Sequence, residues 1–280
     1  MPCPLYHELK TVRTVTRMSV DQPTRLLTEE RRREIVNLLD RQGRVTVAEL
    51  CKLFGVSAVT ARSDLDALHR GGLLVRSHGG GIRPLMTGPD YPLKVRETIH
   101  HEEKQRIAQA AAELIKPFQT VIIGSGTTCA ELALQIRRSP PEHLTVITYA
   151  LNVALRLSDA PDISLMLIGG LFRHVSNALV GPQAEQMIGG LHADHCFLTT
   201  VGIDATIGVT TLDILEAQLN ARILAAAREV TILADSTKFG HRSLAVIAGV
   251  DRLHRIITDR DAPQEALDQF RSRGVEVLVV

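Results

Sequence analysis

The stretch GVSAVTARSDLDAL, residues 55–68, decides the fold of the first part of the chain. Gly55 permits a tight turn, and Ser57 can cap the helix that follows it. Within that helix, apolar side chains recur at i, i+4 and i+7 and so share one face: Ala61, Leu65 and Leu68. Because that face is committed to a core, the opposite face is free to contact another molecule.

The segments on either side predict further short elements. Thr28 can cap a first helix, which Gly43 ends. In a second helix, Leu50 and Leu53 are expected to face inward. The predicted order is the first helix, a short strand (44–47), the second helix (48–54), the helix after Ser57 and a two-stranded hairpin (73–83). This order is typical of a winged helix-turn-helix unit.

The free face of the helix after Ser57 predicts contact with double-stranded DNA. Ala58 is small enough to lie against a thymine methyl group, and Arg62 can donate two hydrogen bonds to a guanine edge. Ser57 and the helix N-terminus can meet a phosphate. The alternative is that Arg62 pairs with Asp66 on a solvated face. The predicted DNA-binding residues are Arg44, Lys52, Ser57, Ala58, Val59, Thr60, Arg62, Ser63, Arg76 and His78.

The charges of the chain are unevenly distributed although the net charge is only +1. Residues 25–83 hold eleven Lys and Arg against seven Asp and Glu, whereas residues 84–280 hold eighteen against twenty-two. An anionic polymer is therefore expected to contact only the first part. The predicted organisation is a loose tail (1–24), a DNA-binding domain (25–83), a linker (84–99) and a larger domain (100–280). Translation can start at Met1 or at Met18.

Other functional classes find little support in the sequence. No apolar run is long enough to span a bilayer, and the N-terminus lacks the apolar stretch of a secretory signal, so we expect a cytoplasmic protein without a membrane partner. The four cysteines are scattered, without zinc-ligand spacing, and they are interpreted as reduced buried thiols. No metal site and no cofactor is predicted.

Beyond residue 100 the pattern changes to an α/β domain. Near-continuous apolar runs, each typical of a buried strand, alternate with stretches of helical period. We expect a mostly parallel sheet covered by helices on both faces, with ligands bound at the carboxyl ends of the strands. The expected strands include TVIIG, LTVITY, SLMLIGG, CFLTTVGI, VTILAD, RIITD and VEVLVV, and the expected helices cover 102–115, 127–137, 181–188, 212–227 and 263–271.

The stretch IIGSGTTCAELA, residues 122–133, predicts a strand, a glycine loop and a helix N-terminus. Such a loop can turn successive N–H groups toward one anion, and hydroxyl groups and the helix dipole add to this. A phosphate fits the site, although the alternative is an ordinary helix start. The loop is neither a Walker motif nor a dinucleotide fingerprint. The residues predicted to bind the anion here are Gly124, Ser125, Gly126, Thr127 and Thr128.

Polar side chains follow other strands and are expected to gather around this loop. They are Asn152, Asp204, Asp235 and Lys238, together with Glu216 from a helix. Carboxylates, an amine and an amide around a phosphate loop predict a pocket for a hydroxylated phosphate ester. The alternatives are that Asp235 caps the next turn and that Lys238 is solvated.

The first part closely resembles the DNA-binding domain of the DeoR family of bacterial transcriptional regulators. The resemblance rests on Arg31, Ile35 and Leu39, spaced by four, and on Ser57, Thr60, Arg62, Asp64 and Leu65. The HGGG stretch at 78–81 also fits the wing. Ser63 departs from the family, which usually has a basic or amide residue there, so a larger share of the recognition falls to Arg62.

The second part resembles the effector domain of the same family, which is similar in fold to ribose-5-phosphate isomerase and glucosamine-6-phosphate deaminase. The matching stretches are SGTT (125–128), IGG (168–170) with Arg173, VGID (201–204), EAQLN (216–220) and DSTKFG (235–240). The resemblance adds Arg173 to the expected effector-binding residues. One departure is TYA at 148–150 where the family commonly has TNS, which implies a different effector or a different way of binding it.

The leading hypothesis is a DNA-binding regulator, a repressor of a sugar-catabolic operon that a phosphorylated sugar relieves. A homo-oligomer is expected, because one winged unit buries little DNA surface and paired half-sites multiply affinity. The runner-up is a sugar-phosphate isomerase or deaminase with a DNA-binding head, in which Glu216 or Asp204 is the base and Lys238 holds an oxyanion. A third hypothesis is a redox or metal sensor that uses Cys129, whose thiolate the helix N-terminus could stabilise. The alternative is that Cys129 only packs in the core.

Overall fold

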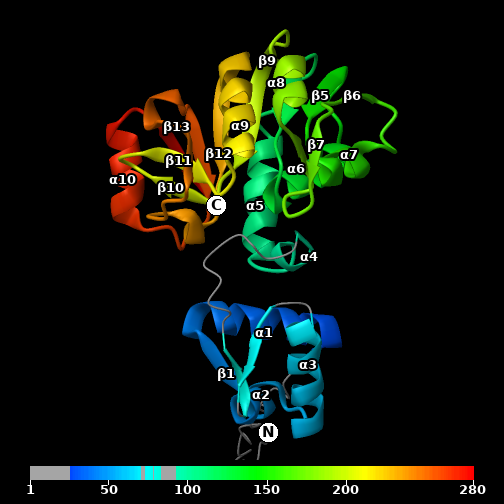
Figure 1. The fold of residues 1–280 in the computed structure, drawn as a ribbon, viewed down its shortest axis with the longest axis vertical. Coiled ribbons are helices and arrows are strands. Elements are labelled where there is room, and N and C mark those ends of the chain that lie inside the picture. The colour runs from blue at the N-terminus through cyan, green and yellow to red at the C-terminus, as the bar shows by residue number, and fades with distance from the viewer. Residues whose placement is uncertain (1–25, 71–72, 78, 83–92) are drawn as a thin grey trace, which may run out of the picture.

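The computed structural model describes residues 26–70, 73–77, 79–82 and 93–280. Residues 26–82 form an N-terminal unit and residues 101–280 form a C-terminal unit, each with its own apolar core (Figure 1). The predicted tail and most of the predicted linker lie outside the described residues. The end of that linker contains a short helix, α4, Leu93–Arg96.

The N-terminal unit is the winged helix-turn-helix that the sequence predicts. Its three strands are antiparallel in the order β1-β3-β2. The core contains Ile35, Leu39, Leu50, Leu65 and Leu68, so the apolar spacing of the third helix is confirmed. The elements are α1 (Thr28–Gln42), β1 (Arg44–Thr46), α2 (Val47–Phe54), α3 (Ala58–Arg70), β2 (Val75–Ser77) and β3 (Gly80–Ile82).

Two local predictions for this unit are wrong. Leu27 is the N-cap of α1, and Thr28 is already its first helical residue, since the Glu30 carboxylate accepts a hydrogen bond from the Leu27 N–H at 2.8 Å. Leu53 is 55% exposed, because the short helix α2 turns only Val47 and Leu50 fully into the core.

The hairpin of the wing depends on a glycine at its return strand. A Cβ on Gly80 would lie 2.1 Å from the main-chain oxygen of Val45 on the neighbouring strand β1. No side chain fits there without moving the backbone, so glycine at this position allows β3 to pair closely with β1.

The C-terminal unit is built on a seven-stranded sheet in which every strand is parallel to its neighbours. The strand order is β15-β14-β12-β9-β4-β5-β6. The α/β prediction is therefore confirmed. The strands are β4 (Thr120–Ile123), β5 (Leu144–Thr148), β6 (Ile163–Leu167), β9 (Ala193–Thr199), β12 (Ala227–Leu233), β14 (Arg255–Thr258) and β15 (Glu276–Val279).

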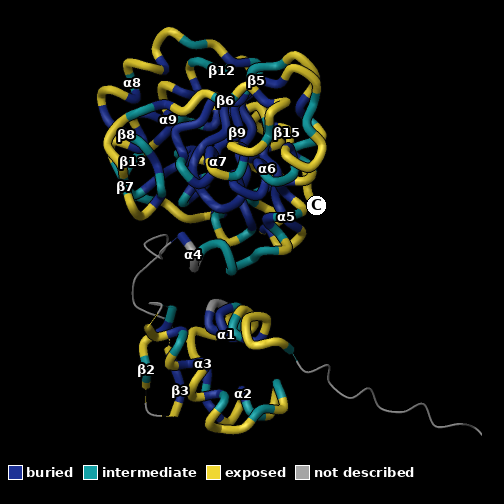
Figure 2. The backbone as a smooth tube through the Cα atoms, turned by 90° about the vertical axis from the view of Figure 1, so that its right-hand side faces the viewer, coloured by how far each residue is buried: buried dark blue, intermediate teal, exposed yellow. Residues whose placement is uncertain are grey.

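Helices cover both faces of this sheet, and each face has its own core (Figure 2). One core includes residues of α5 (His101–Ala112), α6 (Thr127–Arg138) and α7 (Leu151–Leu157). The other includes residues of α8 (Pro182–Ile188), α9 (Ile214–Ala226) and α10 (Gln264–Ser272). Burial on both faces explains why the strands read as continuous apolar runs.

Smaller antiparallel pieces lie beside the main sheet. One has the order β10-β11-β13 and the other pairs β7 with β8. The expected strand CFLTTVGI is divided between β9 and β10, because the chain turns at Thr200 and Val201. The bounds are β7 (Leu171–Arg173), β8 (Ala178–Val180), β10 (Gly202–Asp204), β11 (Gly208–Thr211) and β13 (Ala245–Ala248), with short 3₁₀ helices at Ser236–Lys238 and Val250–Arg252.

Within the ranges described above, no helix is long and apolar enough to cross a membrane.

Candidate functional site

The outer face of α3 is exposed, as the sequence predicts. Ser57 caps the helix, since its Oγ accepts a hydrogen bond from the Thr60 N–H at 3.1 Å. Val59 is 74% exposed and has no part in the core. An isolated apolar side chain between polar neighbours on a helix face suits a groove lined by base edges. The other exposed members of this face are Ser57, Ala58, Arg62 and Ser63.

The wing is tied to α3 by Arg76. Its Nε lies 3.0 Å from Asp66 Oδ1, and its Nη1 donates to the Gly80 main-chain oxygen at 2.9 Å. The carboxylate that could have paired with Arg62 is therefore bound to Arg76 instead. Arg76 orients the wing, while Arg62 stays exposed on the recognition face. Arg44 and Lys52 are also exposed, and His78 lies outside the described residues.

A buried ion pair fixes α3 against α1. Asp64 is 1% exposed, and its two oxygens lie 2.6 Å from Arg31 Nε and 3.0 Å from Arg32 Nε. The family pattern contains both Arg31 and Asp64, but their pairing is visible only in the fold. The ion pair sets the rotation of α3 and so decides which residues point outward.

The glycine loop places the N-terminus of α6 at the carboxyl edge of the sheet, where strand β4 ends. Gly126 is the N-cap, with φ 110°, and α6 has no side-chain cap. A Cβ on Gly126 would lie 2.4 Å from Thr199 Oγ1, so the loop needs glycine here. Uncapped N–H groups at a helix N-terminus form a natural anion site. Thr127 and Thr128, in the first turn, are buried.

Ser125 connects the loop to a carboxylate and a guanidinium. Its Oγ donates to Glu216 Oε1 at 2.8 Å, and Arg173 Nη1 lies 3.6 Å from Glu216 Oε2. Arg173 also contacts Asp213, with 3.1 Å between Nε and Oδ2. Burial raises the pKa of Glu216, although the hydrogen bond from Ser125 and the charge of Arg173 oppose the shift. Three predicted residues therefore meet in one network.

Tyr149 forms the inner wall of this network. Its hydroxyl donates to Asn220 Oδ1 at 2.6 Å and lies 3.4 Å from Ser125 Oγ. Burial raises the pKa of the phenol, so it acts as a neutral donor. The departure from the family at position 149 is therefore a buried ring that supports Asn220 and Ser125. Gly124 lies between this wall and strand β9, because a Cβ there would lie 3.3 Å from the Tyr149 hydroxyl and 2.4 Å from Leu198.

Asn152 has an unused hydrogen-bonding atom beside the loop. Its Nδ2 donates to the Gly126 main-chain oxygen at 3.4 Å, whereas its buried Oδ1 has no hydrogen-bond partner among the described residues. A buried acceptor without a partner is costly unless a ligand supplies a donor. This atom is therefore available to accept a hydrogen bond from a ligand hydroxyl group.

Asp235 and Lys238 lie after strand β12, close to each other. Asp235 accepts hydrogen bonds from the Thr237 N–H and hydroxyl, and its Oδ2 lies 3.9 Å from Lys238 Nζ. Burial favours the protonated form, but the Lys238 and Lys104 ammonium groups outweigh it and lower the pKa of Asp235. The capping role considered for Asp235 is therefore present, together with an ion pair to Lys238.

Asp204 is committed to other partners. Its Oδ1 accepts from the N–H groups of Thr206 and Ile207, at 2.8 and 3.1 Å, and closes the β10–β11 turn. Its Oδ2 pairs with Arg242 Nε at 3.0 Å. Partial burial opposes ionisation, but Arg242 and these N–H groups lower the pKa of Asp204.

The expectation that Cys129 could carry a stabilised thiolate is wrong. Its thiol is fully buried, and burial raises the pKa to about 12 despite the nearby main-chain N–H groups of Gly124 and Thr199. Sγ contacts the Phe197 main-chain oxygen at 3.5 Å. Desolvation outweighs the helix N-terminus, and Cys129 serves the core as a small apolar residue.

Sequence reasoning missed Lys104 and Arg96. Lys104 is buried at the start of α5, and its Nζ donates to the main-chain oxygens of Arg96 and Ile99, each at 2.6 Å. A signal was present, since Lys104 shares the apolar face of its helix with Ile107 and Ala108, three and four residues later. A lysine on such a face needs buried partners.

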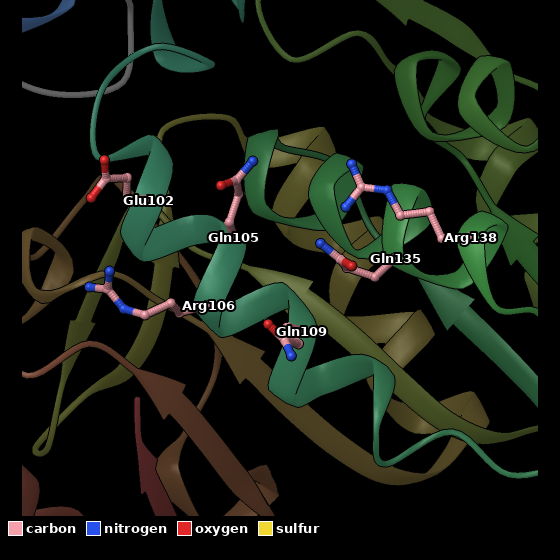
Figure 3. Close-up of a pocket in the computed structure, with 6 residues that line it drawn as sticks. All are labelled: Glu102, Gln105, Arg106, Gln109, Gln135 and Arg138. Carbon is pink, nitrogen blue, oxygen red and sulfur yellow. The ribbon is translucent and has the colours of Figure 1, made fainter.

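A polar groove on the C-terminal unit contains none of the predicted residues (Figure 3). It has a volume of about 490 Å³ and runs between α5 and α6. Its lining consists of Glu102, Gln105, Arg106 and Gln109 from α5 and Gln135 and Arg138 from α6.

Comparisons with known proteins match both units. Residues 31–84 match the family described as DeoR-like helix-turn-helix domain, and residues 99–260 match the DeoR C terminal sensor domain. The chain belongs to the DeoR family. This regulator is 38% identical to a protein named for repression of an aga operon in Escherichia coli O157:H7, over 90% of this chain and 94% of that protein.

Two further relatives of this DeoR-family chain are also named as transcriptional regulators. GolR of Listeria innocua is 33% identical over 89% of this chain and 98% of its own length. UlaR of Shigella dysenteriae is 30% identical over 91% of this chain and all of its own length. The chain is thus a DNA-binding transcriptional regulator with a sensor domain.

Solved structures similar to part of the chain are more distant. A D-ribose-5-phosphate isomerase in complex with phospho-erythronic acid is 15% identical, with a TM-score of 0.38 over 50% of this chain and 54% of that chain. Ribose 5-phosphate isomerase A of Neisseria gonorrhoeae is 11% identical, with a TM-score of 0.36 over 50% of this chain and 53% of its own. Similarity at this level supports no inference about activity.

Proposed function

We propose that this DeoR-family regulator binds a palindromic operator as a homo-oligomer and represses transcription until a phosphorylated sugar occupies its sensor domain. In this proposal α3 enters the major groove, with Ala58, Val59 and Arg62 against base edges. The exposure of this face, which the core does not use, supports the assignment. The relative that is named for repression of an aga operon supports repression. We place the protein in the cytoplasm, because operator DNA and sugar phosphates are both found there.

The chemistry of the effector follows from the carboxyl edge of the sheet. The uncapped N-terminus of α6 suits a phosphate, and the unpartnered Oδ1 of Asn152 suits a hydroxyl donor. Arg173, Glu216 and Ser125 can exchange their mutual contacts for further sugar hydroxyls. The observation that carries the proposal is Asn152 Oδ1, a buried acceptor left without a donor beside an anion site.

The effector acts through differential affinity. A sugar phosphate lowers operator affinity only as far as it binds the DNA-free arrangement more tightly than the DNA-bound one. A coupling of roughly 1–3 kcal/mol, typical of such systems, corresponds to a 5- to 150-fold change in operator affinity.

The test uses Asn152→Leu, which keeps the volume and removes the unpartnered acceptor. A thermal-shift screen of phosphorylated sugars first identifies a compound that stabilises the wild type. We expect Asn152→Leu to bind operator normally and to need about 5- to 150-fold more of that compound for release, because one sugar hydroxyl is left without an acceptor.

The matched control is Asn37→Leu in α1, since Asn37 Oδ1 is also buried without a partner among the described residues. This variant should respond to the sugar phosphate like the wild type. An unchanged response of Asn152→Leu would place the effector elsewhere, and a screen without any stabilising sugar phosphate would refute the effector class.

We infer that the sensor domain binds its ligand without turning it over. The names of the relatives support a regulator rather than an enzyme. Of the two bases considered for an isomerase, Asp204 is occupied by Arg242 and by the β10–β11 turn. Glu216 retains the raised pKa of a general acid or base, so it is the residue to test. Formation of isomer or ammonia from the identified sugar phosphate, abolished by Glu216→Gln, would instead establish an enzyme.

A further inference from the structure

The segment from Leu93 to His100, which we call the strap, contacts both units of the protein. Figure 1 shows α4, its first turn, at the end of the C-terminal unit that lies toward the N-terminal unit. Ile99 packs against the core of the N-terminal unit. Any change in the conformation of the strap therefore reaches the DNA-binding unit directly.

Two adjacent residues in the middle of the strap, Arg96 and Glu97, bind the sensor domain through polar contacts. Arg96 Nη2 donates to the main-chain oxygen of Val175 at 2.7 Å, and Val175 lies in the β7–β8 turn that follows Arg173. Arg156 Nη2 lies 2.9 Å from Glu97 Oε1. These contacts fix the middle of the strap, and Lys104 binds two of its main-chain oxygens.

Lys104, which is buried in the sensor domain, donates hydrogen bonds to two main-chain carbonyl groups of the strap. We call these two hydrogen bonds the grip on the strap. The Lys104 side chain is buried, and two of its three ammonium protons bind the oxygens of Arg96 and Ile99 at 2.6 Å. Directly after Ile99, His100 adopts a left-handed backbone, with φ 49°, which a residue other than glycine seldom adopts. Burying an ammonium group is costly, and a methionine would pack there more cheaply. The grip on the strap accounts for the charge.

The charge of Lys104 also acts on Asp235, one of the candidate effector-binding residues. Lys104 and Lys238 both lower the pKa of Asp235, and the charge of Arg96 opposes the rise that burial causes in the pKa of Glu216. Geometry connects Arg96 to the same site, because Val175, which accepts its hydrogen bond, lies two residues after Arg173, and Arg173 pairs with Glu216. An anion bound beside Glu216 and Asp235 would therefore enter the field of Arg96, Lys104 and Lys238. Each of these cations would lower its electrostatic energy by turning toward the anion.

We propose that Lys104 is the positioning residue that carries effector binding to the DNA-binding unit. An anion at the carboxyl edge competes with the oxygens of Arg96 and Ile99 for the Lys104 ammonium, and the strap that holds Ile99 against the N-terminal core is released. The proposal rests on the proposed function for the location of the effector, but the grip of Lys104 on the strap does not.

The test measures operator affinity of the full-length protein by fluorescence anisotropy between pH 6.5 and 9.5, with a duplex selected from a random pool. Burial lowers the pKa of Lys104 to about 8, and the charges that act on it are Asp235, Lys238, Arg96 and Glu103. Loss of the proton turns two charge-assisted hydrogen bonds into weaker neutral ones. We expect wild-type affinity to fall about 3- to 10-fold in a step near pH 8.

Variants separate this role from simple packing. Lys104→Met should bind operator more weakly and show no step. Lys104→Arg keeps the charge and the donors but does not titrate in this range, so it should keep the affinity measured at pH 7 and lose the step. The matched control is Lys116→Met on the exposed surface of the same unit, which should follow the wild type.

Inorganic phosphate, compared with chloride at equal ionic strength, completes the experiment. We expect phosphate to lower wild-type affinity and to leave Lys104→Met unaffected. A step at pH 8 that persists in Lys104→Arg would overturn the proposal. A step that depends on Lys104, in a wild type that ignores phosphate and every sugar phosphate, would uphold the grip on the strap and refute the effector site instead.

Discussion

The recognition helix α3 and the carboxyl edge of the sheet use polar residues in opposite ways. On α3 the candidate functional residues are those that the core leaves outside, and Arg62 and Val59 are exposed. At the carboxyl edge most of the candidate residues are buried, and Ser125, Glu216 and Arg173 form one network of contacts. A preformed face suits a rigid, highly charged duplex, whereas a network of mutual contacts suits a small ligand that must rearrange it.

The largest effect expected from this comparison is on stability, at the buried ion pair beneath α3. Asp64→Ala leaves the buried guanidinium of Arg31 without its carboxylate, which should lower the free energy of unfolding of the N-terminal unit by about 3–5 kcal/mol. Urea denaturation followed by circular dichroism measures the loss. The control is Asp66→Ala on the same helix, whose pair with Arg76 is half exposed and should contribute about 0–1 kcal/mol. Equal losses would mean that the ion pair does not fix α3.

The second effect is a loss of stability in acid that arises from a buried histidine in the sheet. His195 is buried in β9 and hydrogen-bonded to Thr231, and burial lowers its pKa to about 4. The folded protein therefore binds fewer protons than the unfolded chain between pH 6.5 and 4. The contribution is complete above pH 6.5 and is lost as the pH falls through that range, up to about 3 kcal/mol.

His195→Gln should flatten this part of the stability profile, measured by urea denaturation at each pH. A matched substitution of the exposed His192 should leave the profile unchanged. A profile that keeps its full slope in His195→Gln would show that other groups cause the acid sensitivity.

The third effect is confined to binding. Arg62→Ala should weaken operator binding by roughly 1–3 kcal/mol and relax the base preference at one position, with no change in the free energy of unfolding. Anisotropy titrations on operator variants measure both. Arg70→Ala, an exposed arginine at the other end of α3, is the control and should retain the base preference. If Arg62→Ala and Arg70→Ala both retain the base preference, then Arg62 contacts at most the phosphate backbone of the DNA and no base.

The same comparison explains what could be predicted from the sequence. The spacing of Ala61, Leu65 and Leu68 predicts the buried face of α3 and therefore, by subtraction, the exposed one. The continuous apolar strands predict a sheet covered on both faces. Short helices give less information, and Leu53 of α2 is exposed although its apolar side chain suggested burial.

Predictions at the carboxyl edge depend on distances between segments far apart in the chain. The glycine loop predicted an anion site, but the sequence could not show that Ser125 meets Glu216, 91 residues away. Asp204 follows a strand as Asp235 does, yet it closes a turn and pairs with Arg242. Lys104 was missed because its partners are main-chain oxygens, which no sequence motif records.

Hydrogen exchange on the full-length protein tests the central claim most directly, with operator duplex and with the identified sugar phosphate added separately. The account predicts that DNA protects residues 57–63 of the recognition helix and that the sugar phosphate protects residues 124–128 of the glycine loop. Protection of the sensor domain by DNA with no change at 57–63, or sugar-phosphate protection that leaves 124–128 unchanged, would contradict it.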